Sequence, residues 1–160
     1  EKKLIIVDEN DKILEYKEKN ALKSRDIYRV SALWIINSRG DILLSKPALT
    51  KSLDARKWGP AISQTLEKGE TYYSNIIKES KKKLGLTNIY PTRLEKEKVK
   101  GKNNFFCQWH FLMINKEIKE FNLNKQEIAD IKWFTKKSIC DDIKKNPKKY
   151  LESVKRIMKL

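Results

Sequence analysis

The stretch WGPAISQTLEKGETYYSNIIKESKKKLGL, residues 58–86, contains the features that decide the fold. Its first part, WGPAISQTL, ends in AISQTL, which we interpret as a short strand. The segment after Glu70 repeats apolar residues at helical spacing, and Gly85 supplies a stop signal. We therefore expect a strand, a charged loop and a helix over about residues 71–84, in that order.

Strand patterns surround this stretch on both sides. Alternating or continuous β-rich runs precede it, and an aromatic run, FFCQWHFLMI, follows it. Near the end, Asn146-Pro147 resembles a helix N-cap with proline at the first helical position. Strands before and after a central helix, with another helix at the end, predict a mixed α/β layered domain. The expected elements are an N-terminal hairpin at 1–20, a second hairpin at 28–45, strands at 93–99, 105–114 and 131–134, and a C-terminal helix at 147–160.

The composition limits the classes of protein. A chain of 160 residues with 39% hydrophobic residues predicts one domain over residues 1–160, and no stretch approaches the roughly 18 uncharged apolar residues of a membrane span. The start EKKLIIVDEN lacks signal-peptide features, and the two cysteines are far apart, so we expect a cytoplasmic protein with no membrane partner. The net charge of +15 favours anionic partners, but a lysine-rich proteome explains it equally well.

The charged loop and helix resemble the sequence box of the Nudix superfamily, G-x5-E-x7-R-E-U-x-E-E-x-G-U, in which U is aliphatic. With Glu70 as the register, Glu79, Gly85 and Leu86 fall on box positions. The similarity extends to the second hairpin and to IKWF. Within the superfamily, the chain most resembles the branch that is also similar to isopentenyl-diphosphate isomerase. It implies a Nudix-type α/β/α sandwich around a mixed β-sheet, with the box at residues 64–86.

The resemblance implies hydrolysis of nucleoside or other organic diphosphates with Mg²⁺ or Mn²⁺. In the family, glutamates at relative positions 0, +3 and +4 share one helix face and bind the metal ion. Here these positions hold Glu79, Lys82 and Lys83, so three negative charges are replaced by a net charge of +1. We therefore expect poor metal binding and weak or absent hydrolysis, with the two lysines beside Glu79 as ion pairs.

Other box positions depart from the pattern as well. Gln64 occupies the leading glycine position, where its side chain would crowd the approach of a metal ion and a diphosphate. Lys78 occupies the arginine position, and Ser80 the aliphatic one. Both the glycine and the acidic features of the metal site are thus altered.

Three glutamates are the candidate catalytic residues if the protein is an enzyme. Glu79 and Glu70 keep their box positions and are the remaining candidate metal ligands, and Glu127 lies where some Nudix enzymes place a further acidic residue. Simpler roles compete with these. Glu70 can cap the helix, and Glu67 and Glu127 can be solvated loop charges.

A binding protein is the alternative to an enzyme. In that case lysines and an arginine would hold the phosphates of a small diphosphate ligand directly, because ammonium and guanidinium groups satisfy phosphate oxygens without a metal ion. A weaker alternative is association with RNA, suggested by the net charge and the basic C-terminal segment. The candidate phosphate-binding residues are Lys78, Lys82, Lys83, Lys51, Arg56 and Lys57.

The sequence lacks the residues that isomerase activity would require, so we set this activity aside. The resemblance would require a cysteine after the second hairpin and a histidine-rich metal site, but LLSKPALTKSLDARKWGP contains neither residue type. His110 is the only histidine in the sequence. It lies with Cys107 on the expected strand at 105–114, where we interpret both as core residues.

Overall fold

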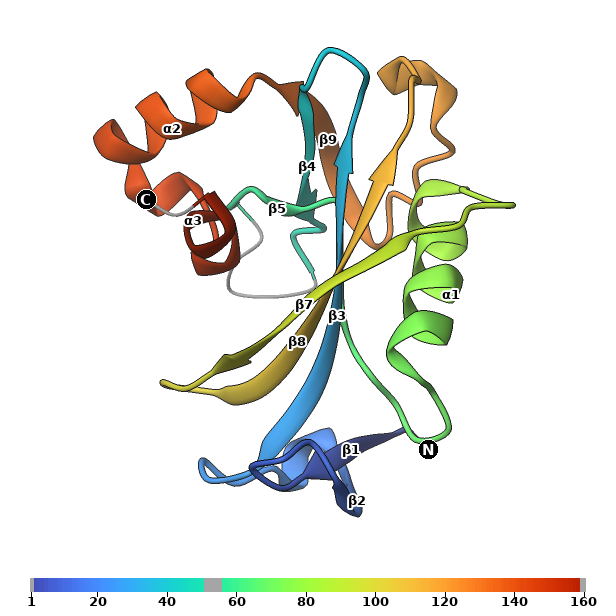
Figure 1. Ribbon diagram of the computed structural model, residues 1–160, viewed down its shortest axis with the longest axis vertical. Helices are drawn as coiled ribbons and strands as arrows, with labels where there is room; N and C mark the ends of the chain where they lie inside the picture. The colour runs from blue at the N-terminus through green and yellow to red at the C-terminus, as the bar shows by residue number, and fades with distance from the viewer. Residues whose placement is uncertain (1, 51–55, 159–160) are drawn as a thin grey trace.

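The computed structural model describes residues 2–50 and 56–158 of the chain. These residues form one mixed sheet, covered by α1 (Tyr72–Leu84) on one face and by α2 (Lys136–Lys145) and α3 (Glu152–Met158) on the other (Figure 1). The predicted α/β/α sandwich is confirmed. The strands are β1 (Lys3–Val7), β2 (Ile13–Glu18), β3 (Ile27–Ile36), β4 (Ile42–Pro47), β5 (Gly59–Pro60), β6 (Ile62–Thr65), β7 (Thr92–Val99), β8 (Asn104–Met113) and β9 (Ile128–Phe134).

Strand β3 is the centre of the sheet. It pairs antiparallel with β1, β4 and β6 and parallel with β8, in a register that places Leu33 opposite His110. The strand β6 that leads into the charged loop therefore lies directly beside β3, with Gln64 opposite Ser31. This pairing fixes the entrance to α1 against the sheet.

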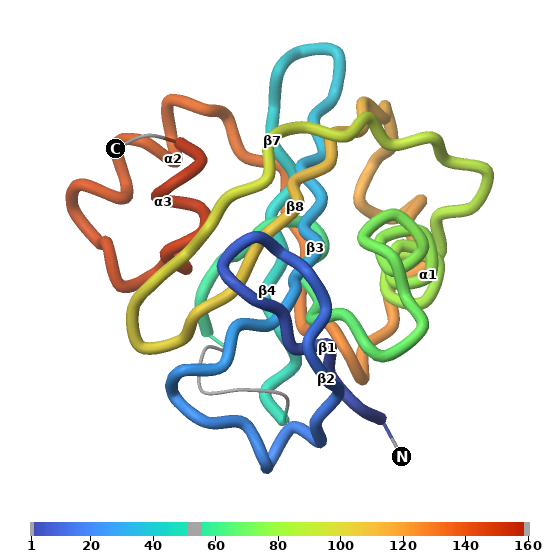
Figure 2. Tube along the Cα trace, turned by 60° about the horizontal axis from the view of Figure 1, so that its bottom comes forward, coloured from blue at the N-terminus to red at the C-terminus, as the bar shows by residue number. Residues whose placement is uncertain are grey.

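The predicted N-terminal hairpin is confirmed. Strands β1 and β2 pair antiparallel, and β1 also pairs with the start of β3. Figure 2, in which the bottom of Figure 1 comes forward, shows this hairpin in front of the sheet. Its turn contacts β7, because Glu9 forms an ion pair with Lys98 at 2.7 Å.

The side chains of β3 and β8 alternate between two cores. Leu33 and Ile35 pack with Ile76 and Leu84 of α1 on one face. On the other face, Val30, Ala32, Cys107 and Trp109 form a cluster against which Ile157 of α3 packs. Because both faces are covered, the continuous aromatic and apolar run of β8 is explained by burial on both sides.

The C-terminal region differs from the sequence-based prediction of one helix at 147–160. Residues Pro147–Lys149 form a single 3-10 turn, and α3 begins only at Glu152. Tyr150 interrupts the helix because it is extended and buried, and its backbone bridges to Trp58. Helix α2 was not predicted, since its sequence is mostly polar and lysine-rich. In residues 2–50 and 56–158, no helix has the length and apolar character needed to cross a membrane.

Candidate functional site

Helix α1 begins and ends at residues that fix its register. Thr71 is the N-cap: its hydroxyl accepts the N–H of Ser74 at 3.0 Å, and the Ser74 hydroxyl accepts the N–H of Thr71 at 2.9 Å. Gly85 ends the helix at φ 69°, where a Cβ atom would lie 2.6 Å from the Cβ of Asn122. Glu70 is therefore not the helix cap, which corrects one sequence-based interpretation.

Polar side chains are buried on α1 beside its apolar ones. Ile76 and Leu84 are fully buried in the core. Next to them, the side chains of Glu79 and Lys83 are only 3% and 11% exposed. Burial of an isolated charge is costly, so these charges depend on their partners.

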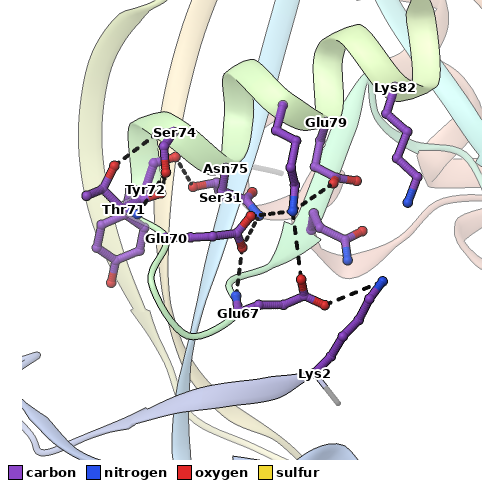
Figure 3. A network of polar contacts seen from close by, with 12 residues as sticks. Lys2, Ser31, Glu67, Glu70, Thr71, Tyr72, Ser74, Asn75, Glu79 and Lys82 are labelled. Atoms are coloured by element: carbon purple, nitrogen blue, oxygen red, sulfur yellow. Dashed lines mark hydrogen bonds and ion pairs between the residues drawn. The ribbon is translucent and has the colours of Figure 1, made fainter.

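The ammonium group of Lys78 lies between three carboxylates. Lys78 forms an ion pair with Glu70, and its Nζ lies 3.8 Å from an oxygen of Glu67 and 3.8 Å from Oε2 of Glu79. Figure 3 labels these three partners, of which Glu67 and Glu70 lie in the loop before α1 and Glu79 lies on the helix. A cation thus occupies the space between the two carboxylates, Glu70 and Glu79, that keep their box positions.

Lys83 joins Glu79 to the neighbouring strand. Its Nζ lies 3.4 Å from Oε1 of Glu79 and donates a hydrogen bond to the side-chain oxygen of Gln64 at 2.9 Å. Burial lowers the pKa of Lys83, although Glu79 and Glu127 oppose that effect. The two departures at Gln64 and Lys83 therefore compensate each other. The side-chain oxygen of Gln64 accepts a hydrogen bond from the Lys83 ammonium, and a glycine at this position would have no side chain to do so.

Lys82 does not pair with Glu79, contrary to the sequence-based expectation. Its Nζ lies 3.7 Å from an oxygen of Glu127 instead. The segment carrying Glu127 is held at the end of α1, because the N–H groups of Asn122 and Asn124 donate to carbonyls of the last helical turn at 3.2 and 3.0 Å. Glu127 is thus bound by a residue of α1 and is not a solvated loop charge. We call the charged side chains joined by these contacts the α1 cluster: Glu67, Glu70, Lys78, Glu79, Lys82, Lys83 and Glu127.

Glu70 is bound from several directions. One oxygen accepts the N–H of Glu67 at 2.7 Å and the side-chain amide of Asn75 at 3.1 Å. Burial alone would raise the pKa of Glu70, but these hydrogen bonds and the contact with Lys78 together lower it. Glu67 also lies 3.8 Å from the ammonium of Lys2, so it belongs to the same network.

Of the three candidate phosphate-binding residues in the loop before β5, Arg56 and Lys57 are described and Lys51 lies outside the described residues. Arg56 and Lys57 directly precede Trp58, whose backbone N–H donates to the carbonyl of Lys149 at 2.8 Å. This segment is thus bound to the C-terminal region, whereas Lys78, Lys82 and Lys83 lie together on α1.

The α1 cluster does not fit a divalent metal ion. Magnesium and manganese prefer several oxygen ligands around one point, but the oxygens of Glu70 and Glu79 face the ammonium groups of Lys78 and Lys83. Within residues 2–50 and 56–158, no group of three His, Cys, Asp or Glu side chains is close enough to hold a metal ion. The donor set instead matches alternating ion pairs.

Three buried polar atoms on α1 have no hydrogen-bond partner within the part of the chain that the structure describes. They are Oδ1 of Asn75, Oε1 of Glu79 and Oγ of Ser80. Most buried polar atoms in folded proteins are hydrogen-bonded, so such groups require an explanation. Sequence reasoning missed Asn75, although its position four residues before Glu79 places it on the same helix face.

The two strand residues set aside as core are buried. His110 and Cys107 are 1% and 2% exposed and lie on opposite faces of β8. Nδ1 of His110 is 3.2 Å from the carbonyl oxygen of Ala32, and burial lowers the pKa of this imidazole. Burial likewise raises the pKa of the Cys107 thiol to about 12, which makes it a poor nucleophile.

Several solved structures share this architecture. The DR0079 protein of Deinococcus radiodurans is 18% identical over 90% of each chain, with a TM-score of 0.77. A MutT Nudix hydrolase from Burkholderia pseudomallei is 16% identical, with 68% of this chain and 83% of that chain covered and a TM-score of 0.57. The Nudix domain of NrtR from Shewanella oneidensis, solved with ADP-ribose, is 10% identical over 78% and 81% of the two chains, with a TM-score of 0.59.

These identities show a shared fold. No family model and no curated protein matches the sequence. The chain has the Nudix fold, as its box and hairpins predicted.

Proposed function

We propose that this Nudix-fold protein binds a diphosphate-containing ligand of the nucleotide type through lysines of the α1 cluster, without metal-dependent hydrolysis. The observation that carries the proposal is the position of Lys78 and Lys83, whose ammonium groups lie against Glu70 and Glu79. These cations stand where the family's chemistry needs a divalent ion.

Electrostatics oppose metal binding at this face. A divalent ion beside Glu79 would lie close to Lys78 and Lys83, and each pair of unit charges about 4 Å apart repels by roughly 4 kcal/mol at an effective dielectric of about 20. It would also have to displace the ammonium groups from buried carboxylates. We therefore expect no tight Mg²⁺ or Mn²⁺ site in the protein as it exists.

Phosphate oxygens suit the exposed part of the cluster. The side chains of Lys78 and Lys82 are 50% and 45% exposed. Among the described residues, Lys82 donates no hydrogen bond, because its contact with Glu127 is 3.7 Å long. Ammonium groups with open donors bind phosphate oxygens without a metal ion. The ADP-ribose complex of the NrtR Nudix domain supports a nucleoside diphosphate as the first ligand to test.

Thermal denaturation with ADP-ribose in the presence of EDTA tests binding. We expect the melting temperature to rise, and Lys82→Gln to weaken the apparent affinity about tenfold. Lys81→Gln is the matched control, because Lys81 is an exposed neighbour on the same helix. Equal loss in both variants, or stabilisation that requires Mg²⁺, would contradict binding by Lys82.

Turnover and metal binding test the other half of the proposal. We expect no hydrolysis of ADP-ribose or nucleoside diphosphates with Mg²⁺ or Mn²⁺. The variant Lys82→Glu/Lys83→Glu should gain Mg²⁺ affinity in isothermal titration, since it restores three carboxylates on one helix face. Micromolar Mg²⁺ binding by the unaltered protein that is lost in Glu79→Gln would instead show an active metal site.

A further inference from the structure

A second basic surface lies away from the α1 cluster, where the turn between β1 and β2 meets the hairpin of β7 and β8. We propose that this surface binds the phosphate backbone of a nucleic acid. Its exposed part consists of Arg25, Lys98 and Lys100, which we call the basic rim. The inference is independent of the proposed ligand of α1.

The spacing of lysines along β7 produces a row of cations. Lys96 and Lys98 lie opposite Gln108 and Phe106 in the strand pairing, and Lys100 continues the alternation just beyond the strand. Side chains two residues apart share a face of a strand and are about 6.6–6.8 Å apart. A row of this kind matches a repeating anion better than a single one.

A buried anchor holds the row in place. Asp11 is 7% exposed in its side chain and accepts hydrogen bonds from Arg29 at 2.7 Å, Lys96 at 2.7 Å and the hydroxyl of Tyr72 at 2.8 Å. Arg29 and Lys96 also lie over the ring of Tyr72, at 5.3 and 5.4 Å from its centroid. This anchor connects the β1–β2 turn with β3, β7 and α1.

The basic rim has fewer acidic partners than cations. Lys98 and Lys100 share one carboxylate, that of Glu9, at 2.7 and 3.0 Å. Arg25 lines the same hollow, and it interacts electrostatically with Asp26, a carboxylate that is already bound by Lys17 at 2.8 Å. Glu9 is 59% exposed, and ion pairs exposed to this degree are weak and easily exchanged. A phosphate group can therefore replace the carboxylate without unfolding any part of the protein.

The hollow at the basic rim favours a chain of phosphates over a small molecule. It has a volume of about 230 Å³ and is lined by Glu9, Arg25, Ile27, Lys98, Val99, Lys100 and Asn104. Typical small-molecule pockets are larger, at roughly 300–1,000 Å³. A polyanion instead gains affinity from many exposed contacts that release counterions.

Fluorescence anisotropy of a labelled 20-nucleotide oligouridine, measured over a salt series with the full chain, tests the proposal. For Lys98→Gln/Lys100→Gln we expect the salt slope to fall by about 1.4 and binding at 50 mM salt to weaken roughly 50-fold, since each lost phosphate contact contributes about 0.7 to the slope. Glu9→Gln should bind roughly twofold to fivefold tighter, because it removes the competing carboxylate.

Two controls separate a defined site from net charge. Lys119→Gln/Lys144→Gln removes the same charge from exposed positions elsewhere, and Lys82→Gln alters the α1 cluster. We expect both variants to change the affinity for oligouridine by no more than about twofold.

Equal weakening by Lys119→Gln/Lys144→Gln would overturn the site. Competition by uridine monophosphate or inorganic phosphate as effective, per phosphate, as the oligonucleotide would overturn the polymeric ligand.

Discussion

Two buried carboxylates, those of Asp11 and Glu79, have different surroundings. Asp11 lies in the turn between β1 and β2 and accepts hydrogen bonds of 2.7–2.8 Å from Arg29, Lys96 and Tyr72, the first residue of α1. Glu79, in the second half of α1, lies 3.4 Å from the ammonium of Lys83, and its Oε1 accepts no hydrogen bond from the described residues. Both carboxylates are almost fully buried, so burial alone does not explain the difference.

The difference indicates two kinds of role. Short, saturated hydrogen bonds around Asp11 are typical of a structural anchor. Long contacts and an unsatisfied oxygen at Glu79 are not optimal for stability, and such deviations concentrate at functional sites. We therefore expect substitutions at the two carboxylates to lower the free energy of unfolding by different amounts.

The largest effect is expected for Asp11→Asn. The substitution keeps the side-chain shape and suits the positive φ of 62° at this position, but it leaves Arg29 and Lys96 without a carboxylate. Loss of one partner from a buried ion pair costs about 3–5 kcal/mol, and we expect about 3 kcal/mol in urea unfolding. Glu9→Gln is the control, since its exposed carboxylate should contribute little. Similar losses for both variants would show that Asp11 is no anchor.

A smaller effect is expected for Lys83→Met. It removes the ammonium beside the buried Glu79, but Lys78 remains 3.8 Å from the same carboxylate. We therefore expect a loss of about 2 kcal/mol in the free energy of unfolding, below the range for a carboxylate left without any partner. Lys82→Met is the matched control, because Lys82 is half exposed and should change stability only slightly.

The double variant Glu79→Gln/Lys83→Met sharpens this result. Removing both charges also removes the cost of burying them, so we expect the double variant to be within about 1 kcal/mol of the unaltered protein. Coupling measured by the double-mutant cycle then reports the pair itself. A double variant about 3 kcal/mol or more less stable than the unaltered protein would show that the buried pair is optimised for stability rather than for binding.

Much of the fold could be predicted because its signals are local. The spacing of apolar residues after Glu70 and the glycine stop at Gly85 fixed α1, and the β-rich runs identified the hairpins. The C-terminal region could not be predicted in the same way. Tyr150 pairs with Trp58, which is far away in sequence, and this contact interrupts the helix expected at 147–160.

The sequence predicted which residues of the candidate site share a helix, but it did not predict all of their contacts. The register placed Glu79, Lys82 and Lys83 on one helix, and Lys83 pairs with Glu79 as expected. The pairing of Lys82 with Glu127 depends on the segment that folds back over the end of α1, and the bond from Lys83 to Gln64 depends on β6. Such contacts between distant segments are set by tertiary packing, for which one sequence carries no local signal.

The smallest effect is expected for Tyr72→Phe. The variant removes one hydroxyl donor to Asp11, while Arg29 and Lys96 remain, so we expect a loss of about 1 kcal/mol near pH 7. Burial alone would raise the pKa of Asp11, but its hydrogen bonds lower it below 3.8. Its contribution to stability is therefore complete above the ordinary pKa and disappears as the pH falls through the lowered value.

The pH dependence distinguishes this hydrogen bond from a packing effect. Tyr72→Phe should raise the folded pKa of Asp11, so acid unfolding followed by circular dichroism should begin at higher pH than in the unaltered protein. The stability gap between the two proteins should also narrow once Asp11 is protonated. Tyr73→Phe, at the exposed neighbouring tyrosine, should leave the acid transition unchanged. A gap that stays constant down to acid pH would mean that the Tyr72 hydroxyl does not act through the Asp11 charge, and the contrast between Asp11 and Glu79 would lose its electrostatic basis.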